Sequence, residues 1–519
     1  MSPTAAVIFV VLVGVTLYIT YWAGKRNKSV GSHLVASGHI TGRQNGIAIA
    51  GDFISAATFL GTTGAIAMLG FNGFYYAVYI PIAYLLAMLL VAEPLRNLGQ
   101  FTLGDVLARR FPAANVRGAI AMSSVFLSLI YIVAQFVGAA VLIKLLFGIE
   151  YWAAAAIIGL LTAIYTLFGG MLATTYIQIV KTAILLACGM ILILLVLNNF
   201  GWNPLELFRQ AADATAANPP AALEPARPGL IQQINQFSLI LGVTIGVLGL
   251  PHVMIRFLTV RNSDEARTSA VTAIWIFAGF LIFLPVLGYG AMLLVENGRA
   301  GLGGGGNLAM PELAKVLGGD LLLSFVSAVA FATILAALSG LVIATSGAVA
   351  HDLYTKLLKQ GRVGPKQQLT VARVATVGAV VVSLLISLAV EQFNVAFLAT
   401  LAITVSASAN LPAILGTIYW RRVTSQGVFY GMVAGLSLSV GMIILSPTFF
   451  DLIPITAPGI ISIPVGFLTM WLVSLATQPK GESLAKANET FDRMRIQAVT
   501  GVDPYDPDYV PPEHRASAH

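Results

Sequence analysis

A single carboxylate lies inside a long apolar run near the N-terminus, among glycines and hydroxyl side chains. Residues 47–64 read IAIAGDFISAATFLGTTG, and the only charged residue among them is Asp52. A charge in the hydrocarbon region of a bilayer is costly unless it is paired or faces a water-filled cavity, so an intramembrane aspartate predicts a functional site. The alternative is a position near a helix end, from which Asp52 reaches the interface. The apolar residues on both sides, from Ile47 to Ile66, argue against that alternative.

Hydroxyl and amide groups around this segment can hold a small anion. Thr58 and Thr62 are four residues apart and share one helix face, and a helix that begins after a break would add the positive end of its dipole. Phe59 and Tyr131 would close a small apolar end. Each hydroxyl could instead bond to a carbonyl of its own helix, as Ser and Thr often do within spans. The candidate substrate-binding residues are Ser55, Thr58, Thr62, Thr63 and Gln135.

The composition is that of a polytopic membrane protein. The 519 residues are 57% hydrophobic and 10% charged, whereas about 25% of residues are charged in soluble domains. The net charge of +7 does not indicate nucleic-acid binding, because the basic residues lie between the apolar runs rather than in one soluble segment. The only cysteine, Cys188, lies in an apolar run, so an intramolecular disulfide is excluded.

Thirteen apolar runs have the length needed to span a membrane. They lie at about 4–24, 47–70, 73–93, 119–147, 151–169, 172–198, 237–257, 269–295, 321–350, 369–390, 395–419, 428–447 and 459–477. If the N-terminus is outside and the C-terminus cytoplasmic, the inside segments and adjoining span ends hold 23 of the 29 basic residues, as the positive-inside rule requires. Lys144 and Lys181 fall within runs, near their ends, where snorkelling to the interface is expected rather than a functional role. We therefore expect an all-α, multi-pass protein of the cell membrane.

Two of these runs are interrupted at corresponding positions. The second is broken around residues 51–57, and the seventh carries Gly249 and Pro251. Proline removes a backbone donor and frees carbonyl groups, and a pair of broken spans entering from opposite sides is typical of inverted-repeat transporters. Glycine and proline are also frequent in ordinary membrane helices. His252 follows the second break, and it either carries a proton or serves as a hydrogen-bonded structural group.

The segments outside the spans are short. Residues 202–217 are predicted to form an amphipathic helix on the membrane surface, and the polar tail from Gln478 is expected to be poorly ordered. The expected divisions are an N-terminal helix and loop (1–46), a first repeat (47–200), an external loop (201–236), a second repeat (237–420), two C-terminal helices (421–477) and a cytoplasmic tail (478–519).

Five segments in the same order as in known transporters resemble the sodium:solute symporter family: GDFISAATFLG, LFGGMLATT, GLPHVMIRF, SAVAFATILA and HDLY. Together they are similar to its acetate permease (cation/acetate symporter) branch, over about residues 4–477. The resemblance implies a five-plus-five inverted-repeat core of spans 2–6 and 7–11, with one extra N-terminal and two C-terminal helices. It also implies cation-driven uptake of acetate, or of propionate, pyruvate, lactate or glycolate, with sodium or a proton as coupling ion and no other cofactor.

The resemblance also implies a sodium site between the second and ninth spans. Two hydroxyl residues that complete this site in relatives are Ala336 and Ala337 here, and many relatives have an aspartate where this chain has Gln178. Asp52 is therefore expected either to replace the missing ligands or to carry a proton itself, because sodium needs oxygen ligands and a carboxylate can serve in both ways. The candidate cation-binding residues are Gly51, Asp52, Ile54, Thr333 and Ser339.

Other function classes lack their sequence signatures. The chain contains neither a GxxxxGK[ST] phosphate-binding loop nor an HExxH metal motif, so an ATP-driven pump and an enzyme are not expected. Repeated filter sequences typical of channels are missing as well, and the tail is too short for the signalling domain of a sensor. The expected partners are a small monocarboxylate and membrane lipid, with no nucleic acid.

Overall fold

The computed structural model describes residues 40–99, 101–216, 222–223 and 229–502, with six further residues between 7 and 18. Within these residues the protein is helical, apart from one isolated bridge between Ile40 and Val260. Ten of the described helices are long and apolar enough to cross a membrane, and Tyr151–Thr166 is a shorter apolar helix. The all-α prediction is therefore confirmed. Most of the predicted span 4–24, and the end of the tail, lie outside the described residues.

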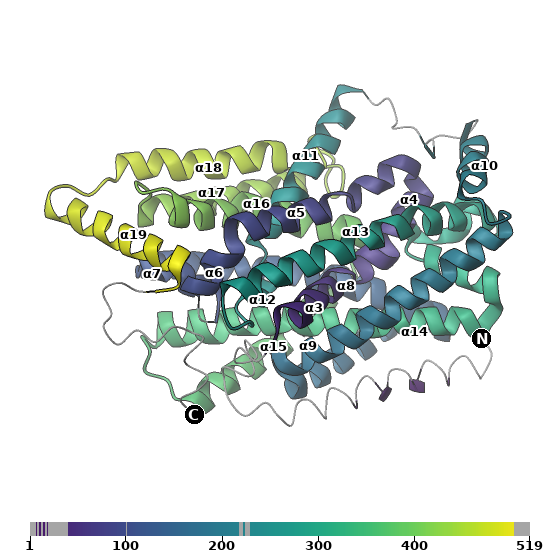
Figure 1. Ribbon diagram of the computed structural model, residues 1–519, viewed down its shortest axis with the longest axis horizontal. Coiled ribbons are helices and arrows are strands. Elements are labelled where there is room, and N and C mark those ends of the chain that lie inside the picture. The colour runs from purple at the N-terminus through teal and green to yellow at the C-terminus, as the bar shows by residue number, and fades with distance from the viewer. Residues whose placement is uncertain are drawn as a thin grey trace.

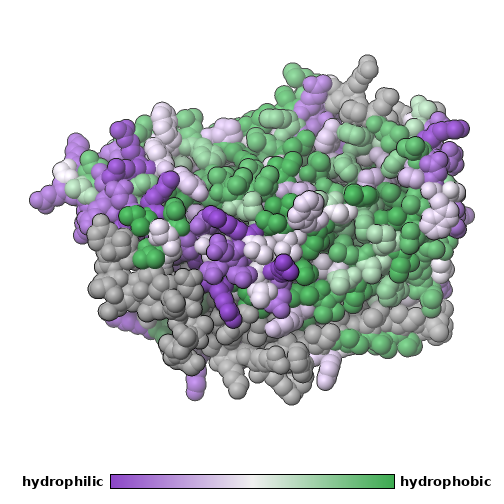
Figure 2. Space-filling view, viewed as in Figure 1, coloured by the Kyte–Doolittle hydropathy of each residue, from purple (hydrophilic) through white to green (hydrophobic). Residues whose placement is uncertain are grey.

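Most of the helices run roughly along the long axis of the molecule (Figure 1). α10 (Pro204–Ala216) lies at one end, and α7 (Leu103–Arg110) and α19 (Glu482–Thr500) lie at the other. Figure 2 shows a hydrophobic surface between the hydrophilic regions of α19 and α10. A belt of this kind is expected where helices cross a bilayer. The helix α10 confirms the amphipathic helix predicted for residues 202–217.

Long helices surround a buried centre. They include α8 (Ala114–Phe147), α9 (Tyr151–Asn199), α13 (Ser263–Leu294), α14 (Ala309–Gly347), α15 (Pro365–Ser387), α16 (Val395–Tyr419), α17 (Ser425–Leu445) and α18 (Gly459–Ala476). α14 packs against α8 and α9, and α16 packs against α8, α17 and α18. Most of α16 is buried, so it lies inside the bundle rather than against lipid. α14 continues directly into the π-helix η8 (Ala348–Leu358).

The predicted spans 47–70 and 73–93 form a hairpin. The first comprises α3 (Gly42–Phe53), the π-helix η2 (Ala57–Thr62) and α4 (Thr63–Leu69), and the second comprises α5 (Tyr79–Ala87), η4 (Met88–Ala92) and α6 (Glu93–Leu98). α4 ends at Gly70, whose φ of 59° is readily adopted only without a side chain. A Cβ atom on Gly73 would lie 2.3 Å from the backbone of Ala65, so the 3-10 turn η3 (Gly70–Tyr76) folds back closely on α4.

Two predicted spans, 151–169 and 172–198, form the single helical segment α9 of 49 residues. Tyr165 and Ile177 nevertheless pack in one cluster with Ala336 of α14. Tyr165 belongs to the first predicted span and Ile177 to the second, so both spans share a buried cluster with α14.

The expectation of a poorly ordered tail from residue 478 is wrong for residues 482–500. Residues 482–500 form α19, which packs on α6 and buries Phe491 and Met494. Asn97 donates a hydrogen bond to the carbonyl of Ala498 at 2.9 Å. The tail sequence looks polar because α19 is amphipathic, and Phe491, Met494 and Ala498 form the buried face of the helix.

Candidate functional site

The first helix break exposes backbone carbonyls at the centre of the protein. α3 ends at Phe53, and Ile54 has non-helical angles of φ −77° and ψ 73°. The N–H of Ser55 donates to the Phe53 carbonyl at 2.9 Å rather than to the carbonyl of Gly51. The Gly51 carbonyl therefore loses the donor that a continuous helix would supply.

The second break is satisfied by a neighbouring helix. α11 (Leu230–Gly246) passes through the 3-10 turn η5 (Val247–Gly249) and an extended residue into α12 (Pro251–Phe257). Ser406 donates to the Gly246 carbonyl and Asn410 to the Gly249 carbonyl, both at 2.9 Å and both from α16. The predicted break at Gly249, Pro251 and His252 thus has its freed carbonyls capped by side chains, as a buried break requires.

Asp52 is paired with a buried arginine. The Nε of Arg256, on α12, donates to one carboxylate oxygen at 2.5 Å, and the side-chain amide of Gln178, on α9, donates to the other. Arg256 is 1% exposed, and its Nη1 also donates to Thr175 at 2.8 Å. A Cβ atom on Gly340 of α14 would lie 3.6 Å from the Asp52 carboxylate. The ion pair therefore lies where α3, α9, α12 and α14 meet, and it balances the charge of Asp52.

Close packing of α3 on α9 holds this arrangement. A Cβ atom on Gly51 would lie 2.3 Å from the hydroxyl of Thr182 and 2.9 Å from the carbonyl of Gln178. Glycine is needed at this crossing because any side chain would push the two helices apart. The close approach is what brings the next residue, Asp52, within reach of Gln178.

Lys181 lies one turn beyond Gln178 and is buried. It is 5% exposed, and its Nζ donates a hydrogen bond of 2.9 Å to the backbone carbonyl of Thr333. The prediction that this lysine snorkels to the interface is wrong, because α14 covers the side chain; Lys144, on α8, is exposed. Thr333 is the residue whose carbonyl the family resemblance assigns to sodium. Ala336 and Ala337, which follow it, are buried and offer no side-chain oxygen.

Two of the predicted substrate-binding residues are joined across the first break. The amide nitrogen of Gln135 donates to the hydroxyl of Ser55 at 3.1 Å, and both residues are fully buried. One turn earlier on α8, the ring of Tyr131 lies 5.0 Å from that of His252. The Oε1 atom of Gln135 and the Nδ1 atom of His252 are buried without a hydrogen-bond partner. Polar groups from three elements therefore meet between the two breaks, and two of their atoms have no hydrogen-bond partner.

The three threonines of this region are placed differently. Thr58 donates to the Phe53 carbonyl at 2.7 Å, and Thr62 donates to the Ala57 carbonyl at 3.3 Å. Thr58 thus bonds across the break to the end of α3, and Thr62 bonds within η2, so both hydroxyl protons go to backbone carbonyls of the same broken span. The hydroxyl of Thr63 is buried and has no partner. Ser339, another predicted cation ligand, is buried beside Gly340.

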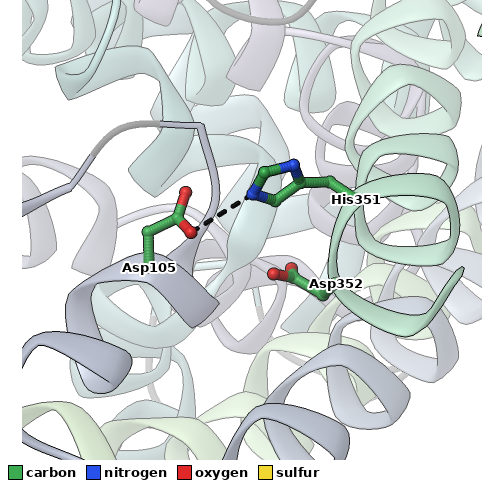
Figure 3. A group of neighbouring side chains, drawn as sticks. All are labelled: Asp105, His351 and Asp352. Atoms are coloured by element: carbon green, nitrogen blue, oxygen red, sulfur yellow. Dashed lines mark hydrogen bonds and ion pairs between the residues drawn. The ribbon is translucent and has the colours of Figure 1, made fainter. Parts of the chain in front are cut away.

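A second polar cluster joins α7, α8 and η8 (Figure 3). The ligand atoms of Asp105, His351 and Asp352 lie within 4.8 Å of one another, which would suit a metal ion. However, Arg117 donates to Asp105 at 3.2 Å and to Asp352 at 2.8 Å, and its guanidinium supplies the positive charge that a metal would bring. The other ring nitrogen of His351 lies 3.2 Å from the amide of Gln368. We interpret this cluster as an ion-pair network that fastens α7 to η8.

This network predicts an acid-dependent loss of stability. Burial raises the pKa of Asp105, but the hydrogen bond and charge of His351, the N–H of Phe101 and the charge of Arg117 outweigh burial and hold that pKa well below its usual range. A lowered folded-state pKa contributes stability that is present above the unfolded pKa of about 3.9 and is lost as the pH falls below it. Asp105→Asn should therefore cost about 1–3 kcal/mol at pH 7, with a smaller difference from wild type near pH 3. Thermal unfolding in detergent at both pH values measures this, and an equal difference at both would contradict it.

Two residues of the central site were missed by the sequence reading. Arg256 is not among the predicted site residues, although it lies four residues after His252 and so on the same face of α12. Lys181 was assigned to the interface, although it lies three residues after Gln178. These spacings are the signals that could have placed both side chains at the breaks.

Comparison with known proteins identifies relatives of the whole chain. The model of the sodium:solute symporter family matches residues 33–435. The uncharacterized symporter YwcA of Bacillus subtilis (strain 168) is 42% identical over 516 residues, which cover 97% of this chain and 99% of that protein.

Solved structures with low sequence identity share the fold. A Na+-coupled sialic acid symporter in a substrate-bound outward-open state has a TM-score of 0.75 at 16% identity, covering 92% of this chain and 99% of that one. Mhp1, a nucleobase-cation-symport-1 family transporter in a closed conformation, has a TM-score of 0.53 at 14% identity, covering 89% and 99%. The fold is therefore that of a polytopic transporter.

Proposed function

Because the chain belongs to the sodium:solute symporter family, we propose that it takes up acetate or a related short monocarboxylate together with a cation. Propionate, pyruvate, lactate and glycolate are the alternative substrates, and sodium or a proton is the coupling ion. The protein would act in the cell membrane, with its N-terminus outside and its C-terminus in the cytoplasm. Residues 47–200 and 237–420 would form the two inverted repeats.

The observation that carries this proposal is the group of buried polar atoms between the two breaks. Gln135 and Ser55 form one hydrogen bond, after which Gln135 keeps a second amide proton, and the Ser55 hydroxyl, which also interacts with Tyr131, keeps its own proton to donate. The Nδ1 of His252 has no partner. A buried polar group without a partner is costly, so a carboxylate that accepts from Nδ1 of His252, in the tautomer that carries a proton there, and from Gln135 and Ser55 would remove part of that cost.

The surroundings favour a small substrate. The ring of Tyr131 lies 5.0 Å from that of His252, and Phe59 is fully buried beside Phe280. We expect these rings to enclose a methyl or other short chain rather than a sugar. Hydrogen bonds from neutral groups, without a direct arginine contact, suit a transporter that must also release its cargo.

Uptake of labelled acetate into proteoliposomes tests the proposal. We expect accumulation above the external concentration only when an inward cation gradient is imposed. Neutral acetic acid crosses lipid, so protein-free liposomes under the same gradients are the control, and labelled pyruvate provides a second substrate. Downhill flux that no sodium or proton gradient alters would contradict symport. A gradient-driven flux that unlabelled short monocarboxylates do not inhibit would contradict the substrate assignment.

A further inference from the structure

The structure places a lysine side chain where the family resemblance predicts a sodium ion. Nζ of Lys181 donates a 2.9 Å hydrogen bond to the Thr333 carbonyl. That oxygen is one of the three carbonyls expected to bind the ion. Lys181 is 5% exposed, so water does not solvate its charge. Among the described residues, this carbonyl is the only hydrogen-bond partner recorded for the lysine.

The remaining groups of the expected sodium site do not fit an ion in addition to the lysine. Ala336 and Ala337 supply no oxygen, and Ala336 packs instead against Tyr165 and Ile177. Asp52, which could have replaced the missing ligands, is already held by Arg256 and Gln178. Two unit charges about 4 Å apart repel each other by about 4 kcal/mol at an effective dielectric constant of 20. Sodium and a lysine ammonium therefore compete for one position.

Two charged groups on neighbouring helices interact with Lys181. Asp52 on α3 attracts it and Arg256 on α12 repels it, and these two are the charged groups that interact with it. Asp52 and Arg256 balance each other, so the ammonium leaves one surplus positive charge in the centre. A bound sodium ion would leave the same surplus, and one monocarboxylate would neutralise it.

We propose that the ammonium group of Lys181 is a tethered cation that replaces sodium at this site, so that transport is independent of sodium. The transport test of this inference rests on the proposed function. The sodium-binding test does not, because it needs no substrate. The lysine would provide the positive charge that stabilises the joint between α3, α9 and α14. Of the two coupling ions considered, only the proton would then remain.

The first test is sodium binding by the purified full-length protein without substrate. The melting temperature of wild type in detergent is expected to be equal in sodium chloride and choline chloride at the same ionic strength. The variant Lys181→Ala/Ala336→Ser/Ala337→Ser frees the position and adds two hydroxyl ligands, so sodium should raise its melting temperature by about 2–5 °C. A sodium-dependent rise in wild type, or the absence of any rise in the folded triple variant, would overturn the proposal.

The second test is labelled acetate uptake by wild type under an inward proton gradient, with sodium or choline on both sides. The rates should agree within two-fold, whereas loss of uptake in choline would overturn the proposal. Lys181→Met should lower uptake at least ten-fold in both buffers, and uptake at the wild-type rate would also overturn it. Lys144→Met, at the exposed lysine of α8, is the matched control and should change neither readout. If no acetate accumulates under any gradient, the proposed function fails, while the melting temperatures still decide the role of Lys181.

Discussion

Replacing Arg256 with methionine is expected to abolish transport and to lower the free energy of unfolding by about 3–5 kcal/mol. The reason is the position of Asp52, which would keep its negative charge inside the bundle with only the amide of Gln178 as a hydrogen-bond donor. Removing one member of a buried ion pair costs more than the pair contributes, because the remaining charge stays unsolvated. Thermal or denaturant unfolding in detergent and labelled-substrate uptake measure the two effects.

The double variant Asp52→Asn/Arg256→Met separates charge from packing. It removes both charges, so most of the lost stability should return, while transport should stay abolished if the pair orders the two breaks. Arg267→Met is the control, because Arg267 is 55% exposed and pairs with Glu93 at the surface, where an ion pair contributes about 0–1 kcal/mol. A double variant as unstable as Arg256→Met alone would show that unpaired charge is not the cause.

The membrane-spanning architecture could be predicted from the sequence because it depends on local composition. Apolar runs of about 20 residues locate the helices whatever lies beside them, and Gly249 and Pro251 mark a break through their own backbone chemistry. Asp52 was also recognisable, because one carboxylate in an apolar run is unusual in any arrangement of helices. These features needed no knowledge of which helices are neighbours.

The side chains that pair with these residues depend on which helices pack together. The linear sequence pattern does not reveal that packing. Arg256 is 204 positions from Asp52 along the chain. Its pairing with Asp52 can be recognised only when the packing of α12 near α3 is known. Lys181 and Lys144 look alike in sequence, each a lysine near a span end, yet α14 covers only the first. The helix α19 was missed for the same reason, since its apolar face has meaning only against α6.

The threonines illustrate how the fold decides between local and distant hydrogen bonds. Ser55, Thr58 and Thr62 are equally polar in the sequence, and all three follow the first break. The Phe53 carbonyl accepts the N–H of Ser55 at 2.9 Å and also the hydroxyl of Thr58 at 2.7 Å. Ser55 instead faces α8 and meets Gln135. The sequence predicted the cluster, but only the packing of α8 shows which hydroxyl proton stays available to a ligand.

This difference predicts that two neighbouring hydroxyl groups will contribute unequally to transport. Ser55→Ala should raise the KM for acetate roughly 10- to 100-fold, because a hydrogen bond to a charged group contributes about 1.5–3 kcal/mol. Gln135→Leu should act similarly, since it removes the amide nitrogen that donates to Ser55 together with its second proton. Thr62→Val, which removes a long hydrogen bond of 3.3 Å within its own helix, should change the KM less than about three-fold.

The comparison is made on proteoliposome uptake rates over a range of acetate concentrations, after thermal unfolding has shown that each variant is folded. If Ser55→Ala and Thr62→Val raise the KM equally, the substrate lies along the whole threonine face of η2 rather than at the Ser55–Gln135 contact. If the KM changes with neither variant, the anion does not bind at the first break. The unequal result follows only if the carboxylate binds where the hydroxyl of Ser55 and the amide of Gln135 meet.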